Sequence, residues 1–154
     1  MTNSHRFRIL SGILLIVVFG GLISMAHADG KAFIWTADDP NLEWAPCPWE
    51  PAPEGCEFAV LQGNPEKPNA DVFLKLPPNS EFAHHKHTSA ERMVLIAGEF
   101  KVDYVGQDPV VMQANTYAYG PAKLPHTSYC LDAGECILFI AFEKPADVIA
   151  VEKR

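Results

Sequence analysis

Histidine is concentrated in two short segments of this 154-residue chain. The first segment, FAHHKHTSAE, contains His84, His85 and His87, and the second, PAKLPH, ends at His126. The remaining two histidines lie within the first 27 residues. Because neutral imidazole is a common ligand of transition metals, this grouping predicts a metal site.

Four side chains from these segments are the candidate ligands. Side chains alternate between the two faces of a strand, so His85 and His87 point to one face and His84 to the other. Glu91 follows after a short stretch that can turn the chain, so its carboxylate can approach from a neighbouring strand. His126 comes from a remote segment that two prolines stiffen. We therefore predict metal binding by His85, His87, Glu91 and His126.

The expected cofactor is one divalent transition-metal ion. Three neutral imidazoles and one carboxylate leave such an ion with a net charge of about +1 and, in octahedral geometry, with two open positions. This ligand set suits iron, manganese, nickel, copper or zinc, and the related set of two histidines and one carboxylate serves non-haem iron oxygenases. Without a thiolate ligand, a purely structural zinc site is less favoured.

The spacing of these residues resembles the first motif of the cupin family. That motif reads Gly, five residues, His-x-His, three or four residues, Glu, six residues and Gly. The matching positions here are Asn79, His85, His87, Glu91 and Gly98. The resemblance implies that both histidines and the glutamate bind the metal.

A second cupin motif matches further along the chain. It reads Gly, five residues, Pro-x-Gly, two residues, His, three residues and Asn, and the positions here are Asn115, Pro121, Lys123, His126 and Cys130. The fourth metal ligand of the family therefore falls on His126. The resemblance covers roughly residues 60–142 and is greatest to small, secreted, single-domain bacterial cupins. It implies a jelly-roll β-barrel with the metal at its mouth.

Four positions depart from the cupin motifs. Asn79 and Asn115 replace glycines, and asparagine also tolerates the left-handed backbone that such turns use. Lys123 replaces the third glycine, which leaves the form of that turn open. Cys130 replaces the asparagine and is explained by a disulfide with Cys136.

Residues 1–28 have the pattern of a secretory signal peptide, with a basic start, an apolar run from Ile9 to Ile23 and a small-x-small cleavage site. An uncleaved membrane anchor is the alternative, although the run is shorter than the roughly 20 residues that span a bilayer. We expect a periplasmic or secreted protein. Residues 29–55 should form an arm, and residues 56–154 one cupin β-barrel domain.

Removal of the signal peptide would leave a formal net charge of −9, because it contains two of the 12 Lys+Arg and none of the 19 Asp+Glu. So acidic a domain has no basic patch for nucleic acid and would be repelled by an anionic membrane surface. The expected partner is a small-molecule ligand or substrate, with no nucleic acid and no membrane after signal cleavage. Whether the chain forms a homodimer is left open.

The four cysteines follow a segment typical of secretion, which favours disulfides over reduced thiols or thiolate ligands. We expect local pairing of Cys47 with Cys56 and of Cys130 with Cys136. A three-residue hairpin loop with Gly134 in the left-handed conformation would place Cys130 directly opposite Cys136.

The predicted fold is a single all-β jelly-roll barrel with an N-terminal arm rich in proline and tryptophan. Repeated prolines exclude a helix in the arm, and its tryptophans should pack onto the core. Short apolar runs then alternate with turn signals, which is typical of a sandwich or barrel. The runs are Glu57–Gln62, Ala70–Leu76, Glu81–His87, Arg92–Asp103, Val110–Met112, Thr116–Tyr119, His126–Leu131 and Cys136–Phe142. The interior should be lined by residues such as Phe73, Met93, Leu95, Ile140 and Phe142.

The leading functional hypothesis is a metal-dependent oxidoreductase of the dioxygenase-like kind that acts on a small organic molecule. The alternatives are a non-catalytic periplasmic binder or metal-dependent sensor and, third, a metal-dependent isomerase or lyase. Beyond the ligands no general base stands out, and Tyr117 and Tyr119 are guesses. The sequence identifies neither the metal nor the substrate and leaves catalysis itself open.

Overall fold

The structure is a computed structural model that describes residues 32–152. The predicted signal peptide, residues 1–28, lies outside the described residues. The described strands are β1 (Trp44–Pro46), β2 (Glu57–Gln62), β3 (Ala70–Leu76), β4 (Ser80–Lys86), β5 (Glu91–Ala97), β6 (Phe100–Tyr104), β7 (Val110–Met112), β8 (Tyr117–Gly120), β9 (His126–Cys130), β10 (Cys136–Phe142) and β11 (Ile149–Ala150).

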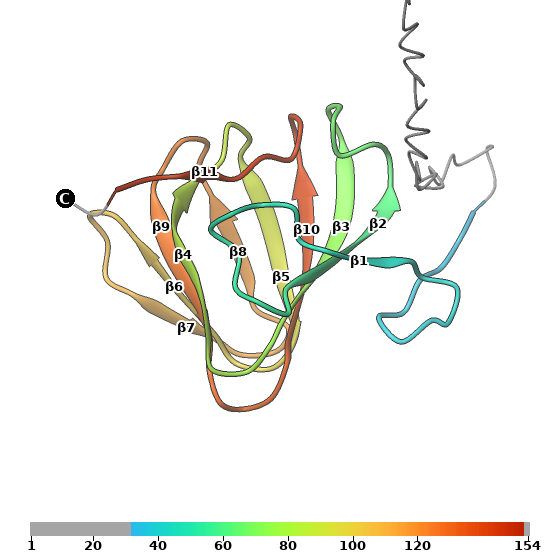
Figure 1. Ribbon diagram of the computed structural model, residues 1–154, viewed down its shortest axis with the longest axis horizontal. Helices are drawn as coiled ribbons and strands as arrows, with labels where there is room; N and C mark the ends of the chain where they lie inside the picture. Colours follow the sequence, from blue (N-terminus) through green and yellow to red (C-terminus); the bar gives the residue numbers. More distant parts are fainter. Residues whose placement is uncertain (1–31, 153–154) are drawn as a thin grey trace, which may run out of the picture.

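These strands form two antiparallel sheets that face each other (Figure 1). Sheet A has the order β1-β2-β3-β10-β5-β8, and sheet B has the order β11-β4-β9-β6-β7. Strands far apart in the sequence, such as β3 and β10, are neighbours, as in a jelly roll. The predicted all-β class is confirmed. No helix within residues 32–152 is long and apolar enough to cross a membrane.

The predicted strand boundaries are confirmed for β2, β3, β7 and β10. The predicted single run Arg92–Asp103 is wrong, because β5 ends at Ala97 and β6 begins at Phe100. Between them Gly98 has a φ of 82°, a left-handed conformation that glycine adopts without steric penalty. The turn sends the chain from sheet A to sheet B, so the two halves of the run lie on opposite sides of the barrel.

The segment between β9 and β10 also crosses between the sheets. The predicted hairpin is therefore wrong: β9 pairs with β4 and β6, whereas β10 pairs with β3 and β5. Gly134 does have a positive φ, of 111°. The predicted disulfide between Cys130 and Cys136 is present, with a Cα–Cα distance of 5.7 Å. This disulfide consequently joins the two sheets.

The inward faces of the two sheets enclose the main hydrophobic core. Four of the predicted interior residues lie in it: Met93, Leu95, Ile140 and Phe142. The prediction for Phe73 is wrong, because the alternation of β3 directs Val72 and Leu74 inward and Phe73 outward. Phe73 belongs instead to a smaller core on the outer face of sheet A. There the Trp44 ring stacks on it with ring centroids 6.4 Å apart.

The loop between β1 and β2 reaches from sheet A towards sheet B (Figure 1). The second predicted disulfide, between Cys47 and Cys56, closes this loop with a Cα–Cα distance of 5.4 Å. In its middle, the carbonyl of Pro51 accepts a 3.0 Å hydrogen bond from the amide of Ala83 in β4. The loop is thereby fixed to both sheets, and its Trp49 packs against the main core.

Candidate metal centre

A β-bulge in β4 positions the first of the histidines. In the register with β9, Phe82 lies opposite Ser128 and His85 lies opposite His126, and the register shifts between these pairs. Phe82 and His85 are therefore both buried, although strict alternation would place them on opposite faces. The bulge thus directs His85 into the barrel beside His126.

Three of the predicted ligands form a compact group between the sheets. His85 and His126 lie on paired strands, and His87 follows directly after β4. The candidate ligand atoms of the three residues lie within 4.8 Å of one another. Their relative exposures are only 3%, 4% and 7% for His85, His126 and His87. Such a buried group is suited to a single metal ion.

Each of these imidazoles is held through Nδ1 by a backbone carbonyl oxygen. The distances are 2.6 Å from His85 to Ala83, 2.5 Å from His87 to Asp147 and 3.2 Å from His126 to Leu124. A carbonyl oxygen can only accept, so each Nδ1 carries the proton and each Nε2 keeps a free lone pair. Metal-binding histidines are commonly oriented by contacts of this kind.

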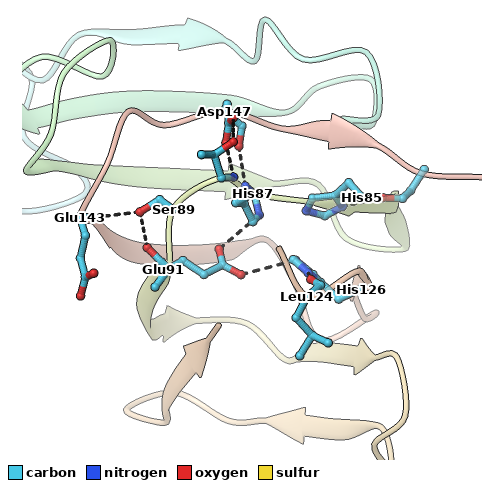
Figure 2. A network of polar contacts seen from close by, with 11 residues as sticks. His85, His87, Ser89, Glu91, Leu124, His126, Glu143 and Asp147 are labelled. Atoms are coloured by element: carbon cyan, nitrogen blue, oxygen red, sulfur yellow. Dashed lines mark hydrogen bonds and ion pairs between the residues drawn. The ribbon is translucent and has the colours of Figure 1, made fainter. Parts of the chain in front are cut away.

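Glu91, the first residue of β5, places its carboxylate beside two of these lone pairs (Figure 2). Oε2 lies 3.5 Å from Nε2 of His87, and Oε1 lies 3.4 Å from Nε2 of His126. Oε1 is buried and accepts no hydrogen bond from the part of the chain that the structure describes. Buried acceptors that face each other repel unless a cation or a proton lies between them. The donor set therefore fits a bound metal ion.

The local environment favours the neutral form of two of these imidazoles, those of His85 and His126. Burial is the main cause that lowers the pKa of His85 to about 3, and the charged forms of the neighbouring histidines contribute to this lowering. Burial also lowers the pKa of His126, although the negative charge of Glu91 opposes this effect. Neutral imidazole is the form that binds a metal, so no proton has to be removed from His85 or His126 at neutral pH.

The three positions where other residues replace cupin-motif glycines keep a left-handed backbone. The φ angle is 58° at Asn79, 69° at Asn115 and 67° at Lys123. The Lys123 amide also donates a 2.8 Å hydrogen bond to the carbonyl of His87. The left-handed turn that precedes His126 therefore forms although lysine replaces glycine. The hydrogen bond to His87 also connects this turn to the residue that follows β4.

His84 and two tyrosines lie away from this group. Nδ1 of His84 is 3.1 Å from the hydroxyl of Thr127, and both residues line a separate groove. Tyr117 and Tyr119 on β8 are 58% and 52% exposed, so neither side chain reaches the site. The guess that one of these two tyrosines is a general base is therefore wrong.

Tyr104 is a site residue that the motifs did not indicate. It lies opposite His126 in the register of β6 and β9, with the ring centroids 4.9 Å apart. Its buried hydroxyl has no hydrogen-bond partner within the described chain. Burial and the charge of Glu91 both raise the pKa of Tyr104, so the phenol stays protonated. In the sequence, Phe100, Val102 and Tyr104 alternate with polar residues, and this period-two pattern could have predicted that Tyr104 faces the barrel interior.

Asp147 is a second residue that sequence reasoning missed. Its carbonyl holds His87, and its carboxylate accepts hydrogen bonds of 2.7 Å and 2.6 Å from the amide and hydroxyl of Thr88 (Figure 2). A segment close to the C-terminus therefore fixes both the ring of His87 and the residue that follows it. No local motif predicts this contact, because the two residues are far apart in the sequence.

Gly120 in β8 leaves the space that Glu91 and Tyr104 fill. A Cβ at this position would lie 2.7 Å from both Oε1 of Glu91 and the hydroxyl of Tyr104, which is too close for any real side chain. Gly120→Ala should displace the carboxylate from the imidazoles. We expect the metal affinity to fall by roughly tenfold or more, as for other changes that disturb ligand orientation. Titration of the apoprotein with metal measures this, and an unchanged affinity would contradict a role for Glu91.

Two facing sheets of jelly-roll type with a buried histidine group define a cupin with a candidate metal centre. The sequence profile of the ChrR cupin-like domain matches residues 39–145. Because this match covers more than half of the chain, the protein belongs to the ChrR cupin-like family. Among curated proteins, no sequence matches the chain.

Several solved structures are similar to this chain. The DMSP lyase DddQ of Ruegeria pomeroyi DSS-3 has a TM-score of 0.61 at 15% identity, and the match covers 71% of this chain and 61% of that one. An RmlC-like cupin of Shewanella frigidimarina NCIMB 400 has a TM-score of 0.57 at 22% identity and coverages of 69% and 86%. A cupin-2 domain of Rhodospirillum rubrum has a TM-score of 0.61 at 12% identity and coverages of 80% and 81%.

These likenesses establish the fold alone, because every identity is low. The chain spans less than two thirds of the length of the DMSP lyases that it matches, with 64% and 61% of those chains covered. An oxalate oxidase structure is also similar, with a TM-score of 0.54 at 15% identity and coverages of 65% and 57%. The reaction must therefore be argued from the site itself.

Proposed function

We propose that this protein is a metal-dependent cupin oxidoreductase, of the dioxygenase-like kind, that acts on a small organic molecule. One observation carries the proposal: the lone pairs of His87 and His126 face the carboxylate of Glu91 at 3.5 Å and 3.4 Å in a buried site. A divalent cation would turn these repulsive contacts into bonds. The carboxylate and imidazole donors suit iron or manganese.

His85, His87, Glu91 and His126 are the proposed ligands of one transition-metal ion. When bound, this ion would supply a Lewis-acidic and redox-active centre. The chain's own residues prepare the site: three backbone carbonyls orient the imidazoles, and Glu91 is the only carboxylate among residues 32–152 that lines the adjoining cavity. The other lining residues are apolar except for Ser128, so they keep water away from the reacting groups.

The proposed compartment is the periplasm. The two disulfides indicate a location outside the cytoplasm, because thiols in the cytosol are kept reduced. The signal-like residues 1–28 would direct the chain there. A metal-dependent sensor or binder without turnover is the second candidate, because the cavity beside the histidines measures only about 40 Å³.

Oxygen consumption tests the proposal. Protein loaded with Fe²⁺ or Mn²⁺ should take up dioxygen in the presence of a suitable small diketone, phenol or carboxylic acid, and the apoprotein should not. Product analysis by mass spectrometry should then find the oxidised substrate. A flat oxygen trace across the panel, together with tight binding of one of its members, would favour the sensor instead.

A further inference from the structure

The cavity beside the histidines is very small. It measures about 40 Å³, whereas one water molecule needs roughly 10–15 Å³ of such space. Larger hollows of about 530 Å³ and 320 Å³ exist on the described surface, but none of the proposed ligands lines them. A molecule that reaches the metal centre can therefore have only a few heavy atoms.

The lining restricts charge as well as size. Among the described residues that line it, Glu91 is the only carboxylate, none is a lysine or arginine, and Ser128 is the only polar residue besides the proposed ligands. Three neutral imidazoles and one carboxylate would leave a divalent ion with a net charge of about +1. One anionic donor group would neutralise that charge. A second charged group would be buried without a partner, which is strongly unfavourable.

Two lining residues mark the way in from solvent. Thirteen of the 15 residues that line the cavity are buried, and the two exceptions are Trp49 and Val148. Both are half-buried, so they have one side towards the cavity and another towards solvent. The entrance therefore lies where these two side chains form the wall, and Trp49 is the larger.

Trp49 is held in place by the loop that carries it. The loop is closed by the Cys47–Cys56 disulfide and by a 2.9 Å hydrogen bond from the amide of Cys47 to the carbonyl of Cys56. The hydrogen bond from Ala83 to Pro51 ties its middle to β4. The indole also packs at 5.4 Å from the ring of Phe58. An incoming molecule thus meets a fixed wall rather than a mobile side chain.

We propose that the metal centre takes a short monoanionic ligand with an apolar remainder, and that Trp49 is the residue that limits its length. The inference rests on the proposed function only in requiring a bound metal ion. It names a substrate class, short-chain carboxylates and similar compact anions, and it assigns a specificity role to a residue outside the histidine motifs.

Binding to the Co²⁺-loaded full mature chain tests the inference without relying on turnover. The visible absorption spectrum of bound Co²⁺ changes when a ligand enters its coordination sphere. Propionate should change the spectrum at saturation, and octanoate should bind roughly tenfold or more weakly, because its chain overfills the cavity. β-Alanine, which has the length of a short acid but carries a second charge, should also bind roughly tenfold or more weakly than propionate.

Trp49→Ala should remove the discrimination by length, so that octanoate binds at least as tightly as propionate. Trp44→Ala is the matched control, because Trp44 packs on the outer face of sheet A and does not line the cavity. This control should discriminate like the wild type. If Trp49→Ala does not fold, Trp49→Leu should still reduce the preference for propionate.

Three results would overturn the inference while leaving the metal site standing: wild-type protein that binds octanoate as well as propionate, an unchanged preference in the Trp49 variants, or no spectral response to propionate at all. Failure to bind Co²⁺ would count against the proposed function itself. The metal content of the same sample therefore distinguishes failure of this inference from failure of the proposed function.

Discussion

Replacement of any one of His85, His87 and His126 by alanine is expected to remove most of the bound metal. Loss of an outer contact that merely orients a ligand already costs roughly 10–100-fold in affinity, so loss of the ligand itself should cost more than about 100-fold. The candidate ligand atoms of these buried side chains lie within 4.8 Å of one another. His84, the remaining histidine of the described chain, contacts Thr127 instead and cannot take the place of a lost ligand. Elemental analysis of purified variants, set against about one ion per wild-type chain, measures the effect.

His84→Ala is the control for this prediction. His84 is the immediate neighbour of His85, yet its ring contacts Thr127 outside the barrel. We expect this variant to retain its metal. Loss of metal in His84→Ala with retention in His85→Ala would mean that the side chains of β4 point the other way in solution.

The period-two pattern predicted much of the geometry of the histidine group, because successive side chains of a strand point to opposite faces of the sheet. It assigned His85 and His87 to one face and His84 to the other, and the structure has this arrangement. The pattern could not reveal the bulge after Phe82, since a bulge depends on the pairing partner β9 rather than on β4 itself. Without this bulge, Phe82 and His85 could not both face inward.

The error at Phe73 and the omission of Asp147 have the same cause, which is contact between distant parts of the chain. Phe73 looked like an interior residue, but the arm supplies Trp44 to cover it from outside. Asp147 gives no local signal, because its role comes from docking beside His87. The Cys130–Cys136 disulfide was predicted from local pairing and from a hairpin. The disulfide is present although the hairpin is not, because six residues of separation along the chain still bring the two cysteines together.

Glu91→Gln is expected to separate the two candidate functions. The substitution keeps the shape of the side chain and one oxygen donor but removes the only negative charge that the described residues contribute to the cavity lining. The new amide nitrogen can also donate a hydrogen bond to Nε2 of His87 or His126, which lie 3.5 Å and 3.4 Å from the carboxylate oxygens, and this hydrogen bond competes with the metal. We therefore expect the variant to keep only part of its metal.

For an oxidoreductase, oxygen uptake per bound ion by Glu91→Gln should fall on the order of 100-fold, because a preorganised charge at the reacting centre is lost. For a sensor, the affinity for its ligand should change only modestly. Glu143→Gln is the matched control, because it removes the same charge from an exposed residue that pairs with Arg92 on the surface, and it should leave both quantities unchanged. Metal content and oxygen uptake are measured on the same samples. Full metal occupancy with undiminished uptake in Glu91→Gln would exclude the role assigned to this carboxylate, because neither the ion nor the reaction would then depend on its charge.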